Sequence, residues 1–318
     1  MKTRILIVSR TEAGRPVASL LKQHLHISWS QARRLVEQNR VRQGPGLCRD
    51  PQSRVRAGQK LRVQLDEAKK PQHLSELPRS AGPQPIIRHV DDQIVVVDKP
   101  AGLTTMRHAH EAAEFGARGK RFLPSTLADQ LPALLGDRGK KPVIAVHRLD
   151  RDTSGLVVFA RTAHAARHLG GQFRAHTTQR TYIALVRGRA RNERIESRFV
   201  ADRGDGRRGS TAGGEQRAIT QVRVLEELGA FTLVECRLET GRTHQVRIHL
   251  GERGTPICGE RIYDRPLHGA PLSDTSGAQR LALHAASLAI EHPTTGKRLG
   301  WASPMPADLS LLLKQLRK

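Results

Sequence analysis

The feature of this sequence that most restricts its fold is a polar stretch at residues 67–85 that contains four prolines. Few apolar side chains are available there to anchor it, so the composition predicts a linker. The linker would separate a small region, residues 1–66, from a larger one, residues 86–318. A chain of 318 residues is long enough for two domains of roughly 150 residues, each with its own core.

The charge of the chain predicts a polyanionic partner. The sequence has 54 Lys and Arg against 30 Asp and Glu, a formal net charge of +24. Nucleic acid is the simplest partner for such a charge. Of the basic residues 42 are Arg, whose planar fork suits phosphate groups and stacking on bases. A GC-rich genome would also favour Arg, but the imbalance is larger than codon choice requires.

The cysteines and the apolar runs indicate a soluble cytoplasmic protein without a membrane segment. Cys48, Cys236 and Cys258 are far apart and form no CxxC pair, which argues against a zinc ribbon or a disulfide framework. No apolar run approaches the ~20 residues of a membrane helix. The apolar stretch in the first ten residues, MKTRILIVSR, is too short for a secretory signal. A monomer is the simplest expectation for so cationic a chain.

The small region has the pattern of a compact RNA-binding domain. Helices are predicted over 16–25 and 30–38, the second capped by Ser30, with strands from Val41 and over 61–65. The stretches S-W-S-Q-A-R-R-L-V-E-Q-N-R-V-R-Q-G and V-R-A-G-Q-K-L-R-V resemble the αL-type RNA-binding domain first known from a small-subunit ribosomal protein. That resemblance implies RNA contacts from the basic residues Arg33, Arg34, Arg42 and Lys60.

The large region predicts an α+β domain with a mixed, mainly antiparallel sheet and flanking helices. Apolar strands are expected at 94–97, 143–146, 156–160, 182–186, 222–225 and 231–238, the last two as a hairpin. Helices are expected after caps at Ser125 and Thr162, and over 308–316. The order of elements does not alternate as in a doubly wound fold.

The segment H-R-L-D-R-D-T-S-G-L at residues 147–156 carries the first chemical signal. Two apolar strands flank it, so it must be a connecting loop that displays Asp150 at the edge of the sheet. Neighbouring cations favour the ionised carboxylate, which can then act as a nucleophile or a base. Taken alone, an aspartate that makes hydrogen bonds within a turn is the simpler interpretation.

The segment L-E-T-G-R-T-H-Q-V-R-I-H-L at residues 238–250 carries the second signal. Thr243 is expected to cap a short helix that ends at Gly254. Val246 and Leu250, one turn apart, would face the core. Arg247 would then lie in the first turn and could reach a cleft at the end of the preceding strand.

Together these segments closely resemble the RluA-like pseudouridine synthases of the ribosomal large-subunit type. The matching motifs are H-R-L-D-x-x-T-S-G and T-G-R-T-H-Q-x-R-x-H-L, with weaker matches at 95–103, 179–188 and 283–299. The resemblance implies the fold of that family and the isomerisation of uridine to pseudouridine in RNA, most simply ribosomal RNA. The reaction oxidises nothing and imports no group, so no cofactor and no metal is expected.

The resemblance also implies roles for individual residues. Asp150 would be the catalytic aspartate, Arg247 its ion-pair partner, and Tyr182 would stack on the target base. Arg148 would fill the gap left by the extruded uridine, whereas Asp152 would have no role. Whether the aspartate attacks C1′ or removes the C2′ proton to give a glycal stays open, because both routes need an ionised carboxylate.

Two departures from the family pattern bear on the choice of substrate. The segment 254–260 has Thr255 where His is usual and Glu260 where Asp is usual, and we expect neither to touch the three catalytic candidates. The insert at 106–142 is longer and more basic than expected.

Three other functions compete with this one. They are a transfer-RNA pseudouridine synthase, a non-catalytic RNA-binding or ribosome-assembly protein, and a glycosidase that uses Asp150 together with Asp152. A glycosidase would need the two carboxyl groups about 5–9 Å apart across a sugar cleft. Nothing in the strongly basic composition favours a neutral glycan.

Overall fold

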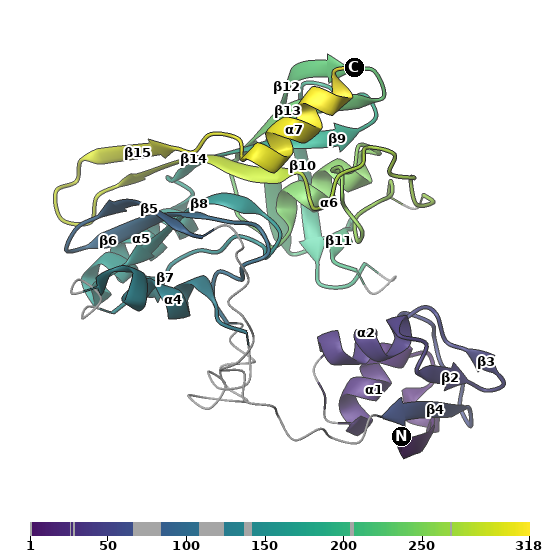
Figure 1. Cartoon of the computed structure of the whole chain (residues 1–318). Helices are drawn as coiled ribbons and strands as arrows, with labels where there is room; N and C mark the ends of the chain where they lie inside the picture. Colours follow the sequence, from purple (N-terminus) through teal and green to yellow (C-terminus); the bar gives the residue numbers. More distant parts are fainter. Residues whose placement is uncertain are drawn as a thin grey trace. The chain divides into compact units, whose positions relative to one another are not determined.

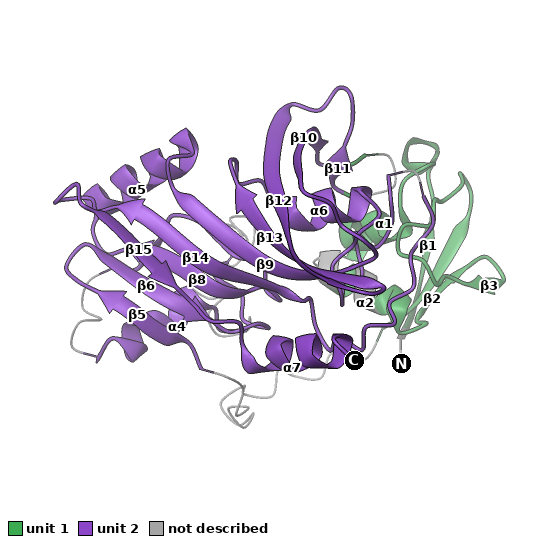
Figure 2. Ribbon diagram, turned by 90° about the horizontal axis from the view of Figure 1, so that it is seen from above, with its two compact units in different colours: residues 1–77, 202–207 green, residues 78–201, 208–318 purple. Residues whose placement is uncertain are grey.

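The computed structural model shows two compact units, residues 1–77 with 202–207 and residues 78–201 with 208–318 (Figures 1 and 2). The structure describes residues 2–25, 27, 29–65, 84–107, 124–136, 142–203, 207–267 and 269–318. The predicted linker up to residue 83 and most of the basic insert 106–142 therefore lie outside the described residues.

The first unit is a four-stranded sheet with two helices. The sheet has the order β1–β4–β2–β3, and its elements are β1 (Lys2–Ile7), η1 (Arg10–Glu12), α1 (Val17–Leu25), α2 (Trp29–Glu37), β2 (Val41–Gln43), β3 (Gly46–Leu47) and β4 (Lys60–Leu65). Strand β1 was not predicted. Leu6 is buried between the exposed Ile5 and Ile7. All three residues are apolar, so the sequence shows no alternation of apolar and polar residues that would predict a strand.

Both predicted helices of this unit are present, and they bury one side each. Ala32 and Val36 of α2 pack with Leu20 and Leu21 of α1 in a core formed entirely by residues between 6 and 65. The predicted cap at Ser30 is wrong, because α2 begins at Trp29 and Ser30 lies inside it.

The second unit is built on an eleven-stranded sheet, which confirms the α+β class. Its strand order is β11–β10–β12–β13–β9–β14–β8–β6–β5, with β15 on β14 and β7 on β8, and only the β14–β8 pair is parallel. The strands are β5 (Ile86–Val90), β6 (Ile94–Lys99), β7 (Ile144–Ala145), β8 (Ser154–Ala160), β9 (Gln179–Arg187), β10 (Glu193–Val200), β11 (Gly209–Ser210), β12 (Gln216–Leu228), β13 (Phe231–Leu238), β14 (Leu283–Glu291) and β15 (Arg298–Ala302).

Helices cover both faces of this sheet, which explains the uninterrupted apolar runs of its central strands. Val157 and Phe159 of β8 face one core together with the helices α4 (Leu127–Leu134), α6 (Gln245–Glu252) and α7 (Ala307–Leu316). Leu156 and Val158, which alternate with them, face a second core against α5 (Ala163–Ala175). None of the helices in the described part of the chain is long and apolar enough to cross a membrane.

The helix caps agree only partly with the sequence prediction. Thr162 caps α5 as expected, accepting a hydrogen bond from the backbone N–H of Ala165 at 3.0 Å. The cap of α4 is Thr126 and not Ser125, because Asp129 returns the interaction and completes a capping box.

Gly155 of the T-S-G motif brings β8 and β14 into close contact, and we expect its replacement to be costly. Its φ is +114°, and a Cβ would overlap the backbone of Ala285. Gly155→Ala should lower the free energy of unfolding by about 3 kcal/mol or more, because strain and overlap add. Urea unfolding measures this. Gly171→Ala, at an open position in α5, is the control and should stabilise slightly. Equal stabilities of the two variants would contradict this account.

Candidate active site

The loop between β7 and β8, which carries Asp150, is held by buried polar contacts from the neighbouring strand. The ammonium of Lys99 donates to the carbonyls of Pro100, Leu103 and Arg151 at 2.8–3.1 Å. Burial lowers the pKa of Lys99 to about 7. The Thr105 hydroxyl donates to the carbonyl of Leu149 and accepts from its N–H. These bonds fix the backbone on both sides of Asp150.

His147 at the start of this loop is structural. Its Nε2 accepts a hydrogen bond from the N–H of Val158 at 3.0 Å, and its ring stacks on Phe173 with centroids 4.4 Å apart. Burial lowers the pKa of His147 to about 3, which keeps the ring neutral and able to accept.

Asp150 and Arg247 meet as the sequence predicted, although 97 positions separate them. The Arg247 Nη1 donates to Asp150 Oδ2 at 3.1 Å. Val246 and Leu250 face the core as expected and thereby aim the first turn of α6 at the loop. Within the described residues, Asp150 Oδ1 accepts no hydrogen bond. One carboxylate oxygen is therefore available to a substrate.

His244 approaches that second oxygen, and sequence reasoning did not assign it there. Its Nε2 lies 3.6 Å from Asp150 Oδ1, and its Nδ1 lies 2.7 Å from the hydroxyl of Tyr263. His244, and not the predicted Thr243, is the N-cap of α6, with a left-handed backbone at φ +59°. Burial lowers the pKa of His244, and the Asp150 charge opposes that shift.

Glu260 corrects the expectation that segment 254–260 does not touch the site. Its carboxylate forms a two-pronged ion pair with Arg247, Nε to Oε2 at 2.7 Å and Nη2 to Oε1 at 2.9 Å. The Glu260 side chain is 1% exposed. Burial disfavours both charges, yet their pairing holds the pKa of Glu260 below and that of Arg247 above its usual value.

The sequence did single out Glu260, as a glutamate where the family usually has aspartate, but this departure was interpreted as bearing on substrate choice. The segment returns to α6 through the Arg247–Glu260 pair, and the N–H groups of Arg261, Ile262 and Tyr263 also bond to Glu260 Oε1. The Arg247 guanidinium lies over the Tyr263 ring, 5.2 Å from its centroid. Both tyrosines of the chain, Tyr182 and Tyr263, thus belong to this region.

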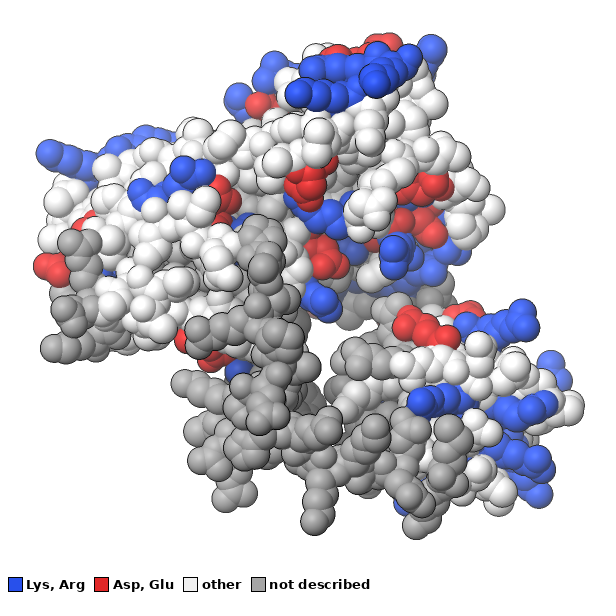
Figure 3. Space-filling view, in the orientation of Figure 1, with Lys and Arg blue, Asp and Glu red and all other residues white. Residues whose placement is uncertain are grey.

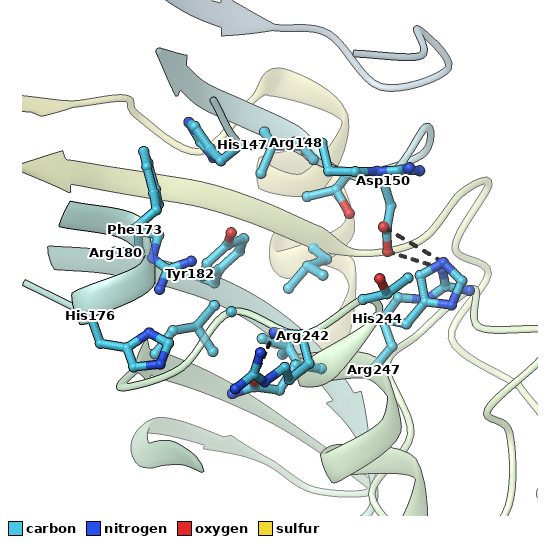
Figure 4. A pocket seen from close by; sticks show the side chains of 18 of the residues that line it. His147, Arg148, Asp150, Phe173, His176, Arg180, Tyr182, Arg242, His244 and Arg247 are labelled. Carbon is cyan, nitrogen blue, oxygen red and sulfur yellow. Dashed lines mark hydrogen bonds and ion pairs between the residues drawn. The ribbon is translucent and has the colours of Figure 1, made fainter. Parts of the chain in front are cut away.

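A pocket of about 450 Å³ opens beside Asp150 (Figure 4). Its walls come from the Asp150 loop, the end of α5, β9 and the segment that leads into α6. Tyr182 of β9 lines it and is 8% exposed, and burial raises the pKa of its hydroxyl. Arg148 is exposed and also lines it, so the structure brings the four predicted residues Asp150, Arg247, Tyr182 and Arg148 to one pocket.

The structure gives no support to the paired-carboxylate alternative. The Asp152 side chain is 59% exposed, is not part of the pocket wall, and faces Arg151 at 3.8 Å. The alternative therefore lacks its second carboxyl group.

The predicted RNA-binding residues of the first unit are described within that unit. Arg42 and Lys60 are exposed on β2 and β4, and Arg42 is paired across the strands with Arg62, which sequence reasoning did not select. Arg33 and Arg34 lie in α2, but their side chains are outside what the structure describes.

Comparison with known proteins agrees with this geometry. The RNA pseudouridylate synthase family model matches residues 93–252. A ribosomal large subunit pseudouridine synthase D of Zymomonas mobilis is 34% identical over 95% of this chain and 92% of its own length. A protein of the same name from Nitrosomonas europaea is 38% identical over 71% of this chain. The matched region covers 64% of the length of that relative.

A solved structure agrees in fold. The human RNA pseudouridylate synthase domain containing 4 superposes with a TM-score of 0.57 at 24% identity, over 73% of this chain and 92% of that one. The fold and the matched family together define an RNA-modifying isomerase. The chain belongs to the RNA pseudouridylate synthase family.

Proposed function

We propose that this protein isomerises uridines of large-subunit ribosomal RNA to pseudouridine, with Asp150 as the catalytic aspartate. The observation that carries the proposal is the Asp150–Arg247 pair at 3.1 Å in the pocket that Tyr182 lines. The relatives named as ribosomal large subunit pseudouridine synthase D support ribosomal RNA over transfer RNA. We further propose that the protein acts as a cytoplasmic monomer, since strong positive charge opposes self-association.

The reaction breaks the N1–C1′ bond of uridine, turns the base and joins its C5 to C1′. A base stacked in a helix cannot reach the pocket, so the nucleotide must be flipped out at a cost of a few kcal/mol. Stacking on Tyr182 would return about 1–3 kcal/mol, and Arg148 at the rim would occupy the vacated space. No step needs an oxidant, a metal or an imported group.

In this scheme Asp150 meets the sugar through Oδ1, because Oδ2 is held by Arg247. An ionised oxygen there can attack C1′, or it can remove the C2′ proton. Both routes use the same orientation of the carboxylate. Arg247 keeps that orientation and stabilises the negative charge.

A map of pseudouridine in cellular RNA, with and without the gene, tests the proposed function. Loss of one or more pseudouridines from large-subunit ribosomal RNA, with conversion of the same uridine by the purified protein, is the expected result. Loss of pseudouridines from transfer RNA alone would show that transfer RNA, and not ribosomal RNA, is the substrate. An unchanged map together with an inactive purified protein would leave the non-catalytic RNA-binding alternative.

We also propose that residues 1–66 supply affinity for RNA and not chemistry. They carry 14 Lys and Arg against 4 Asp and Glu, and cationic side chains lie on the visible surfaces of both units (Figure 3). Deleting them should weaken RNA binding at least about tenfold at moderate salt and flatten its salt dependence, because fewer counterions are released.

Binding titrations at several salt concentrations measure that effect. Turnover of a short stem-loop should survive the deletion, since the core of this region is formed by its own residues. If the shortened protein still unfolds cooperatively but has lost this turnover, residues 1–66 would be needed for catalysis as well as for affinity, which would contradict the proposal.

A further inference from the structure

The pocket beside Asp150 has a second, cationic end that the isomerisation chemistry does not use. Arg180 of β9 lies there, toward the opposite end from Asp150 (Figure 4). It is 9% exposed, and its Nε and Nη2 are buried without a hydrogen-bond partner among the described residues. Its guanidinium lies over the face of Phe173, 5.4 Å from the ring centroid.

A buried arginine whose hydrogen-bond donors are unsatisfied lowers the stability of the folded protein. The guanidinium stays protonated at all accessible pH values, and a buried charge whose donors are unsatisfied loses its hydration without compensation. Phe173 provides only part of the stabilisation through its ring. An anion bound at this end of the pocket would offset that cost.

A second arginine and a histidine lie at the same end. His176 and Arg242 line the pocket with Arg180, and His176 lies close enough for both arginines to depress its pKa, in addition to burial. The Arg242 Nε donates to the carbonyl of Arg217 at 3.0 Å, and its other guanidinium nitrogens make no hydrogen bond within the described residues. Among the residues that line the pocket, Asp150 is the only carboxylate, and it lies at the other end.

This cationic end opens into a groove across the sheet. His176, Arg180 and Leu238 line both the pocket and the groove, which continues over β9, β12, β13, β14 and β15. The groove adds the side chain of Arg298 and the ring of Trp301, together with Arg237, which pairs with Glu235 at 3.2 Å. Its one acidic residue, Glu239, is neutralised by a two-pronged pair with Arg194 at 2.9 Å. A positive groove with an aromatic ring is typical of a path for single-stranded nucleic acid.

We propose that Arg180, with Arg242 and His176, binds a backbone phosphate of the RNA next to the flipped uridine, and that the strand leaves the pocket through this junction into the groove. The inference rests on the proposed function, because it takes RNA as the substrate. A phosphodiester provides an anionic partner for the Arg180 guanidinium. Phosphate contacts fix the register of the strand and so place C1′ opposite Asp150.

The first test measures binding of Arg180→Met to a ribosomal RNA fragment that the wild-type protein converts. Affinity should fall about ten- to a hundredfold, as expected for lost hydrogen bonds between charged groups. The slope of log K against log salt should decrease by about 0.7–1. Arg191→Met, which removes the same charge from the exposed loop between β9 and β10, outside the pocket, is the matched control and should change affinity less than twofold.

The second test locates the phosphate and does not depend on the stability of a variant. Neutral methylphosphonate linkages are placed one at a time on either side of the target uridine. Wild-type protein should lose at least about tenfold in affinity at one linkage, and Arg180→Met should lose nothing further there. Uniform small losses at every linkage, or an Arg180→Met protein that binds like the wild type, would overturn the inference. A wild-type protein that converts no uridine would instead defeat the proposed function.

Discussion

Asp150→Asn should abolish pseudouridine formation while RNA binding is kept. The amide fills the same space and leaves Arg247 its partner atom, but it offers neither an anionic nucleophile nor a base at the Oδ1 position. We expect the rate of product formation under saturating protein to fall at least about a thousandfold. The measurement is single-turnover conversion of a ribosomal RNA fragment, with affinity for the same RNA determined separately.

Asp152→Asn is the matched control for this prediction. It removes the same charge from the same loop, but the Asp152 side chain is 59% exposed and outside the pocket. Its conversion rate should stay within about threefold of the wild type, because isolated surface charges contribute little. Equal, normal rates in both variants would remove the catalytic role of Asp150 and favour a protein that only holds RNA.

Glu260→Gln should cost both stability and activity, because the change leaves the buried Arg247 cation with Asp150 as its remaining carboxylate partner. Removing one member of a buried ion pair typically destabilises a protein by about 3–5 kcal/mol. The amide also cannot accept the two charge-assisted bonds that orient the guanidinium. We expect a lower midpoint of urea unfolding and a slower single-turnover rate with RNA affinity nearly unchanged.

Two further variants separate the role of Glu260 from a general effect of charge. Glu196→Gln removes an acidic group that pairs with Arg194 and Arg217 on the surface, and it should leave stability and rate unchanged within error. Glu260→Asp keeps the charge on a shorter arm and should restore part of the lost rate. If Glu260→Gln were as stable and as fast as the wild type, Glu260 would not position Arg247.

Strands such as β8 and β9 were predictable because the sheet is covered on both faces, but the central strand β14 was not predicted. An uninterrupted apolar run of five residues such as 156–160 is typical of a strand that is buried on both faces. Strands with one exposed face gave weaker signals. β1 and β10 (Glu193–Val200) were missed, and in β10 apolar residues such as Ile195 and Phe199 are spaced among charged ones. Helix caps were misplaced by one residue at Thr126 and His244, since the choice of cap depends on the local backbone.

Sequence alone determined which side chains stand at the reacting end of the site. Asp150 and Arg247 each sit in a short segment whose local structure, a loop between apolar strands and the first turn of an amphipathic helix, follows from neighbouring residues. Tertiary structure decided what surrounds them. Glu260 reaches the site through its pair with Arg247, and His244 is held beside Asp150 by its contact with Tyr263. Arg180 reaches the pocket because β9 and the Asp150 loop both line it. Burial of a charge, and hence its need for a partner, is a property of packing between distant segments.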